Sequence, residues 1–488
     1  MTRTFAPWVV LGIFVLYLAA PAVLPARSAS GFDVTAFGRL PVSANGRVQP
    51  FDSVARTALL QIRGPVTAPI DGLKASQARP AMIDPTPWLL EVLAKPDTAD
   101  TRRVFAIADH ELLGKLQLPA ASRGTNYFAF ADLGPRASQI QEQVQHIANV
   151  EPSDRARWQR ELVALRDNLV LYERLKNSLV PSTRLQSDAR GQPVTFDFAG
   201  ELVRYEADLT EALRVDAGRR RGSTERLEVG AEMRIRAFAA LFQVVSRTGV
   251  LALIPKATGS SHRWSNIGSV VVQSALGSQP SQPVAFFAGM SSAFAQGKPD
   301  SFNAQLAQYR QWLAANGLAG EARRSAFEAL SNLLLPLVRA IVLYAVALVL
   351  LGVALRTGSA AVHRSGLMLV LLASALHATG LLLAAVLAGR PSWLALAGWA
   401  IGLAALVVER WRRSGHAALA GAAVGLTALV AAYAVAPGGA ASLLRNALEA
   451  SLVVAIGAAV LALSVGRGPR SARPPAPAAP AALESPAA

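Results

Sequence analysis

Apolar residues are distributed very unevenly along this chain, and that distribution constrains the fold more than any other feature. A hydrocarbon core of about 30 Å is crossed by about 20 apolar residues in a helix. Segments that reach or nearly reach this length lie at residues 7–25, 333–355, 366–388, 393–409, 417–436 and 447–466. Residues 26–332 have ordinary globular character. The sequence therefore predicts a mainly α membrane protein with six transmembrane helices and a large domain between the first and second.

These segments divide the chain into parts of different character. The expected parts are an N-terminal transmembrane anchor, an extramembrane domain, a five-helix transmembrane bundle and a tail, at residues 1–30, 31–330, 331–466 and 467–488. The tail is rich in proline and alanine, so we expect it to be disordered. Ser28-Ala29-Ser30 would also serve as a signal-peptide cleavage site. The length of the first apolar segment and its prolines, Pro21 and Pro25, favour a retained anchor instead.

The positions of arginine predict the orientation in the membrane. Arg356 and Arg364 flank the loop after the second apolar segment. The basic stretches "ERWRRSGH" (Glu409–His416) and "RGPRSAR" (Arg467–Arg473) follow the fourth and sixth segments, whereas the alternate loops hold a single arginine each. By the positive-inside rule, both termini are expected in the cytoplasm and the large domain on the outer face.

Composition excludes several classes of function. The net charge of +16 comes largely from the inner loops and from Arg219-Arg220-Arg221, which favours anionic lipid headgroups or haem propionates over nucleic acid as partners. The absence of cysteine excludes disulfides, thiolate metal sites and covalently attached c-type haem. No nucleophile elbow, phosphate loop or metal-binding helix motif is present. We therefore expect no catalytic residues, no metal site and no enzymatic activity of the chain by itself.

The stretch "GRLPVSANGRVQPFDSVARTALLQIRG" (Gly38–Gly64) opens the large domain. Asn45-Gly46 is a strong turn signal, and Pro50 ends the extended piece behind it. A short amphipathic helix should follow, capped by Asp52 or Ser53. The apolar residues that share one face of this helix are Val54, Ala58, Leu59 and Ile62.

The rest of the large domain is expected to be mostly helical with a few short strands. Residues 153–180 carry apolar side chains at three- and four-residue steps, which predicts a packed helical seam. Helices are also predicted at residues 200–216 and 228–247. "VTFDFAG" (Val194–Gly200) and "GVLALIP" (Gly249–Pro255) are predicted as strands.

Two histidines are candidates for binding. His377 lies near the middle of the third apolar segment, where an imidazole needs a hydrogen-bond partner, a metal or a watery cavity. A bond to Ser374, Thr379 or a neighbouring span is one interpretation. Ligation of haem iron is the other, because imidazole is a common axial ligand. His262, in the loop-like "SSHRWSN" beside Trp264, is a weaker candidate for a ligand surface.

Several segments, in order, resemble the large CcsA-type proteins of system II cytochrome c biogenesis. The opening stretch resembles the start of their periplasmic region. The likeness continues in "DPTPWLLEVLAKP", "FAIADHELLGKLQLP", "YFAFADL", "LALIPKA…RWSNIG", "FAQGKPDSFNAQLAQY", "FEALSNLLLPLVRAIVLYAVALVLL" and "LHATGLLLAAVLAGRP". Together these segments cover most of residues 38–410.

The chain also departs from the family pattern. After Gly-Arg-Pro it has Ser392 and "WLALAGW", where the family has a second proline or a polar residue followed by an Asn-x-Tyr-Glu-Ser stretch. The tryptophan-rich WWD segment that docks haem, and the two periplasmic histidines that flank it, are absent. The chain thus resembles the front half of a CcsA-type protein, whose haem-attaching core would come from another polypeptide.

The resemblance implies an accessory subunit of c-type cytochrome maturation in the bacterial inner membrane, with its large domain in the periplasm. Such a subunit would position apocytochrome c, a separate CcsA-like membrane protein, or both, as part of a haem lyase complex. His377 would then be a transient haem ligand. The alternative is a scaffold for assembly of a respiratory membrane complex. It would bind no haem, and His377 would be a structural residue.

Overall fold

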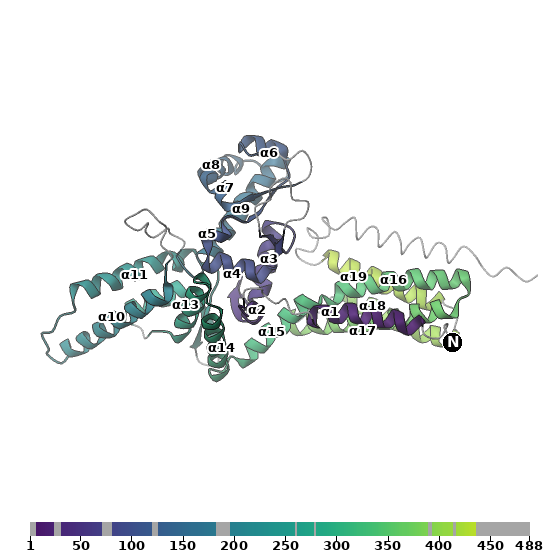
Figure 1. The fold of residues 1–488 in the computed structure, drawn as a ribbon. Coiled ribbons are helices and arrows are strands. Elements are labelled where there is room, and N and C mark those ends of the chain that lie inside the picture. The colour runs from purple at the N-terminus through teal and green to yellow at the C-terminus, as the bar shows by residue number, and fades with distance from the viewer. Residues whose placement is uncertain are drawn as a thin grey trace, which may run out of the picture. The chain divides into compact units, whose positions relative to one another are not determined.

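The computed structural model describes residues 6–23, 31–70, 81–119, 125–181, 196–258, 261–277, 280–388, 393–412 and 416–435. The described residues are mainly helical. The chain divides into two compact units. The large unit is Leu24–Leu334, and the bundle unit combines Met1–Val23 with Leu335–Ala488. Figure 1 colours both units along the chain.

The large unit opens with a short helix, a hairpin and a longer helix: α2 (Val34–Gly38), β1 (Pro41–Ala44), β2 (Arg47–Pro50) and α3 (Phe51–Ile62). The predicted turn is confirmed, because Asn45 and Gly46 join the strands with φ values of 53° and 76°. The apolar face predicted for α3 is also buried. The predicted cap is wrong. Pro50 occupies the N-cap position without a side-chain bond, and Asp52 and Ser53 fall inside the first turn.

Three further two-stranded antiparallel sheets occur in the described residues. Their strands are β3 (Ala68–Pro69) with β4 (Met82–Ile83), β5 (Arg103–Ile107) with β6 (Asn126–Ala129), and β7 (Ile254–Thr258) with β8 (Ser261–Ser265). The helical elements between β4 and the middle of the unit are α4 (Pro85–Ala94), α5 (Pro96–Ala99), α6 (His110–Lys115), α7 (Phe130–Leu133), η1 (Gly134–Arg136), α8 (Ala137–Ile147) and α9 (Arg157–Lys176). The seam predicted for α9 lies in the core.

Two long helices, α10 (Phe198–Arg219) and α11 (Val229–Thr248), run side by side (Figure 1). The strand predicted at "VTFDFAG" is wrong in its described part, because α10 begins inside it. Phe198 is fully buried, and its ring lies 4.9 Å from the ring of Phe242 on α11. Helix-to-helix packing of these aromatic rings therefore outweighs the local strand preference.

The large unit ends with the helices α12 (Ile267–Ala275), α13 (Gln282–Ala295), α14 (Pro299–Ala315) and α15 (Ala319–Leu334). Only part of the strand predicted at "GVLALIP" forms, since Ala252 makes an isolated bridge to Ser43 and β7 begins at Ile254. The core of the unit includes large side chains that are fully buried on elements far apart in the chain, such as Phe51, Trp88, Tyr172 and Tyr309.

The bundle unit consists, in its described residues, of α1 (Ala6–Val23), α16 (Pro336–Thr357), α17 (Ala360–Ala388), α18 (Trp393–Arg412) and α19 (His416–Val435). Small residues allow close packing of α18 on α19. A Cβ atom added to Gly421 would lie only 2.7 Å from Cβ of Ala405. Large apolar side chains such as Leu371, Ile401 and Trp411 remain exposed on the outside.

Three described helical stretches are long and apolar enough to cross a membrane: Ala319–Thr357, Ala360–Leu383 and Trp393–Trp411. Two shorter apolar helical stretches cover Pro7–Leu16 and His416–Ala432. The sixth predicted segment, at residues 447–466, and the predicted tail lie outside the described residues.

Candidate functional sites

His377 lies on α17 inside the bundle unit, and its side chain is fully buried. Its ring contacts the ring of Tyr344 on α16 edge-on, with 6.1 Å between the ring centroids. Within the described residues, neither Nδ1 nor Nε2 has a hydrogen-bond partner of regular geometry. The backbone of Ala395, on α18, lies close enough to interact with the ring. His377 is therefore enclosed by three helices and poorly paired.

The hydrogen bonds considered for His377 from the sequence do not form within its own helix. The hydroxyl of Ser374 pairs with the hydroxyl of Tyr344 at 3.1 Å. The hydroxyl of Thr379 donates to the backbone oxygen of Ala375 at 2.9 Å, as is usual for threonine in a helix. Both neighbours are therefore satisfied without His377.

His377 offers the donor atom that a haem iron needs, but the packing around it leaves no room for a haem macrocycle. The side chain has no exposed surface. One turn along α17, a Cβ atom added to Gly380 would lie 2.2 Å from a methyl carbon of Leu337 on α16. Haem would have to separate these helices, so the arrangement described does not fit it, and we assign no haem-transfer step to His377.

His262 belongs to the large unit, whereas His377 belongs to the bundle unit. His262 lies on β8 opposite Ala257 of β7. On the same strand, Nε1 of Trp264 donates to a carboxylate oxygen of Glu321 at 3.1 Å. The structure thus places His262 on a hairpin beside a tryptophan that already has a partner. The described part of the chain has no group of three or more acidic or histidine side chains arranged to hold a metal ion.

A polar cluster that the sequence did not reveal lies beneath the opening stretch. Glu328 of α15 is buried and accepts hydrogen bonds from Arg47 at 2.8 and 2.9 Å. The hydroxyl of Ser53 donates to the same carboxylate at 2.6 Å. Asn332, one turn further along α15, donates to Ser53 at 2.8 Å and to Asp52 at 3.1 Å. These bonds join α15 to the hairpin and to α3.

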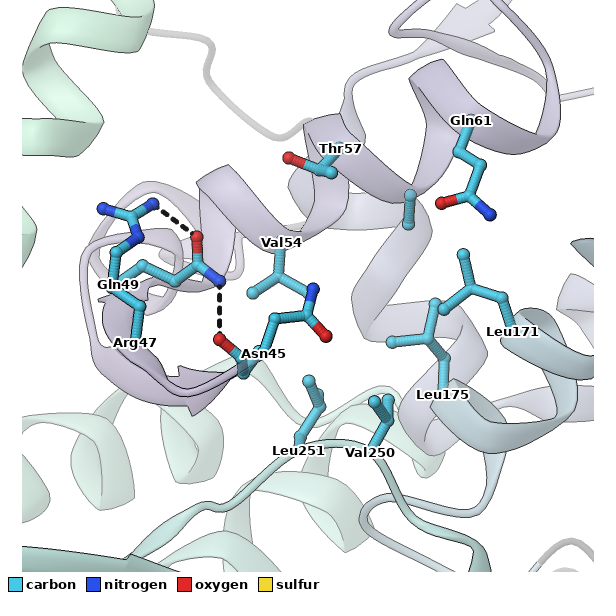
Figure 2. Close-up of a pocket in the computed structure, with 12 residues that line it drawn as sticks. Asn45, Arg47, Gln49, Val54, Thr57, Gln61, Leu171, Leu175, Val250 and Leu251 are labelled. Carbon is cyan, nitrogen blue, oxygen red and sulfur yellow. Dashed lines mark hydrogen bonds between the residues drawn. The ribbon is translucent and has the colours of Figure 1, made fainter. Parts of the chain in front are cut away.

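A pocket of about 280 Å³ includes Arg47 of this cluster in its lining. Figure 2 shows the lining side chains. Its lining comes from the β1–β2 hairpin, α3, α9 and the segment before β7. The lining residues are Ala44, Asn45, Arg47, Gln49, Val54, Thr57, Ala58, Gln61, Leu171, Leu175, Val250 and Leu251. Aliphatic side chains form one part of this lining, and amide and hydroxyl groups form the other. Such a combination is typical of a binding site.

Hydrogen bonds hold the hairpin side of the pocket in place. The amide oxygen of Gln49 accepts from a guanidinium nitrogen of Arg47 at 2.6 Å. The amide nitrogen of Gln49 donates to the backbone oxygen of Ala44 (Figure 2). Asn45 is in the left-handed region, which sets the direction of its side chain at the tip of the turn.

Another polar group lies between the C-terminal end of α5 and α9. The hydroxyl of Tyr172 donates to Asp100 at 3.0 Å, and the ammonium group of Lys176 donates to the same carboxylate at 2.8 Å. Burial raises the pKa of Tyr172 well above its usual range, and the charge of Asp100 raises it further. Lys176 also lies over the ring of Phe130 at 4.4 Å. These contacts supply the carboxylate of Asp100 with two hydrogen-bond donors from α9, so the group has a structural role.

The chain was compared with protein-family models, with curated proteins and with solved structures, and none of the three comparisons found a match.

Proposed function

We propose that this protein is an accessory membrane subunit of c-type cytochrome maturation. Its large unit would position apocytochrome c, a separate CcsA-like haem-handling protein, or both. The observation that carries this proposal is the pocket, because the opening stretch that resembles the CcsA-type proteins supplies its hairpin and α3. The segment that begins "LALIPKA" supplies Leu251 to the same pocket. Two segments of the resemblance, distant in the chain, thus build one concave surface.

The proposed setting is a bacterial inner membrane, with six transmembrane helices, the large unit in the periplasm and both termini in the cytoplasm. Three described helices of sufficient length and apolar character support the membrane location. The alternation of basic and weakly charged loops supports the orientation. A flexible apocytochrome segment would then meet the large unit on the side where haem is attached.

A scaffold that assembles a respiratory membrane complex without touching haem is the second candidate. The enclosure of His377 favours it, since a fully buried ring cannot meet haem while α16, α17 and α18 remain packed. In the maturation proposal, a partner protein would have to open the bundle before His377 could ligate iron.

The test uses cells that lack this chain, complemented with the full-length protein, with His377→Ala or with a variant lacking residues 38–320. Covalent haem in c-type cytochromes is measured by staining after denaturing electrophoresis, and protein abundance by immunoblot. His146→Ala is the matched control, because His146 is exposed on α8.

We expect full-length protein to restore cytochrome levels and the deletion variant to fail. His377→Ala should restore them if the subunit acts by positioning its partners. Loss of cytochromes with His377→Ala at normal abundance would establish His377 as a haem-handling residue. Normal cytochrome levels with the deletion variant would refute the maturation proposal.

A further inference from the structure

We propose that the pocket beside the β1–β2 hairpin binds one neutral, apolar side chain of an extended partner peptide and holds the adjoining peptide groups at its polar rim. The identity of the physiological peptide rests on the proposed function, whereas the binding chemistry does not. The proposal follows from the size, the lining and the charge of the pocket.

The size and floor of the pocket fit a single side chain. Its volume of about 280 Å³ is just below the range of about 300–1,000 Å³ typical of sites for drug-sized molecules. Val54, Ala58, Leu175 and Leu251 are buried and form an aliphatic floor. A leucine or phenylalanine side chain would gain from burial against this floor, whereas a haem macrocycle would exceed the space.

The rim offers hydrogen bonds that the protein itself does not use. Asn45 and Thr57 are exposed, and their side chains make no hydrogen bond with another described residue. Amide and hydroxyl groups can both donate and accept, which matches the N–H and C=O groups of a peptide backbone. Figure 2 shows Asn45 and Thr57 among the side chains drawn around the pocket.

Charge argues against an acidic ligand. Among the described residues that line the pocket, Arg47 is the single charged one. Both of its terminal nitrogens already bond to Glu328, so its charge is compensated within the protein. A fatty-acid carboxylate or a haem propionate would find no free counter-charge and would lose its hydration on entry. A neutral peptide segment carries no such cost.

The absence of cysteine from the chain allows a direct binding test. Leu60→Cys in the full-length protein in detergent gives one attachment site for an environment-sensitive fluorophore, because Leu60 is exposed on α3 next to the lining residue Gln61 and does not itself line the pocket. N-acetyl-leucinamide and N-acetyl-phenylalaninamide should change its emission in a saturable way, with Kd values on the order of 1–10 mM. The α-amide of N-acetyl-aspartate should give no saturable change. A label at Thr210→Cys, exposed on α10, should not respond.

A variant with a filled pocket tests whether the probes bind in the pocket. Ala58→Leu adds a side chain to the floor and should weaken binding of both probes at least tenfold while the thermal unfolding temperature stays close to that of the parent. If Ala58→Leu does not fold, Leu171→Ala enlarges the pocket instead. It should shift the preference toward the phenylalanine probe by several-fold.

Three results would overturn the proposal: no saturable response to either probe, a response unchanged by altering the pocket, or tighter binding of octanoate than of N-acetyl-leucinamide. The last result would assign the site to an acyl chain. The assay contains no cytochrome, so its result is independent of the haem-staining experiment. A failure of the maturation proposal would leave the binding result standing.

Discussion

At the scale of single residues, the buried side chain of Tyr172 connects α9 to neighbouring elements through its ring and its hydroxyl. Its ring stacks on Phe130 with 5.1 Å between centroids and lies edge-on to Phe105. Its hydroxyl donates to Asp100. The aromatic contacts provide burial, and the hydrogen bond satisfies a carboxylate that would otherwise lose a partner.

Replacing Tyr172 by phenylalanine should lower the free energy of unfolding of the large unit by about 1–2 kcal/mol, because only the bond to Asp100 is lost. The raised pKa of Tyr172 means that the folded state keeps this proton where the unfolded state releases it. Its contribution to stability is therefore complete below pH 10 or so and is lost as the pH rises further. Tyr172→Phe should show a weaker loss of stability over that alkaline range.

The measurement is denaturant unfolding of the full chain in detergent, followed by near-ultraviolet circular dichroism between about pH 8 and pH 11. Other buried tyrosines, such as Tyr309, titrate in both proteins, so the difference between parent and variant isolates Tyr172. An identical alkaline loss of stability in the two proteins would contradict the prediction.

Replacement of His377 should raise the stability of the protein, whereas replacement of Tyr172 should lower it. His377→Leu replaces a poorly paired, fully buried imidazole by an apolar side chain of similar size. We expect the bundle unit to gain about 1–3 kcal/mol, the usual cost of an unsatisfied buried polar group. Thermal unfolding in detergent tests this prediction. His363→Leu is the control, because His363, unlike His377, has an acidic partner: Nε2 of His363 lies 3.8 Å from a carboxylate oxygen of Glu409. A loss of stability in His377→Leu would show that the imidazole has a stabilising partner.

At the scale of elements, hydrogen bonds attach α15 to the hairpin and to α3. Glu328 is the centre of this attachment. The side chain of Glu328 is 9 % exposed and that of Arg47 is 51 % exposed. Screening by water at Arg47 therefore reduces the energy of the pair, whereas removal of Arg47 leaves a buried carboxylate short of one partner.

A double-mutant cycle measures this attachment. Glu328→Ala and Arg47→Ala should each lower the free energy of unfolding of the large unit by about 1–3 kcal/mol, with a coupling energy of about 1 kcal/mol. The exposed pair Glu211–Arg214 on α10 serves as control and should couple by less than about 0.5 kcal/mol. Equal coupling in the two pairs would mean that burial of Glu328 adds nothing.

Small residues allow α18 and α19 to pack closely against each other. Gly421→Leu places a side chain where even a Cβ atom would meet Ala405 at 2.7 Å and the backbone oxygen of Gly402 at 3.0 Å. The helices must separate, and we expect a loss of about 1–3 kcal/mol in the stability of the bundle unit. Gly12→Leu on α1 is the control, because a Cβ atom there meets nothing within 4 Å. Similar unfolding temperatures for the two variants would contradict the prediction.

At the scale of the whole molecule, the division into two units follows the distribution of apolar residues. The bundle unit exposes apolar side chains that suit lipid, while the buried apolar side chains of the large unit form one core. Arginine positions then predict which side of the membrane holds the large unit.

Single cysteines test that orientation, since the parent chain has none. Thr210→Cys lies on the large unit, and Ser359→Cys lies between α16 and α17, next to Arg356 and Arg364. In intact cells whose outer membrane has been removed, an impermeant maleimide should label Thr210→Cys alone. Both should be labelled after the membrane is opened with detergent. Labelling of Ser359→Cys in intact cells would reverse the proposed topology.

Local physical chemistry in the sequence determined much of the fold. The Asn45-Gly46 turn, the buried face of α3 and the seam of α9 all follow from backbone preference or from apolar periodicity within one element. The same is true of α14, where Phe302, Leu306, Tyr309 and Leu313 recur at helical spacing and are buried. Each of these signals lies within about 20 residues of chain.

Tertiary structure alone decided the sites. Glu328 meets Arg47 across 281 residues of chain, and the pocket combines α3 with α9 and Leu251. The surroundings of His377 depend on α16 and α18 as well as on α17. A polar side chain can be satisfied by any partner that folding brings within about 3 Å, so its partner leaves no pattern in the neighbouring sequence. Apolar periodicity identifies the buried face of a helix, but only packing determines what that face meets.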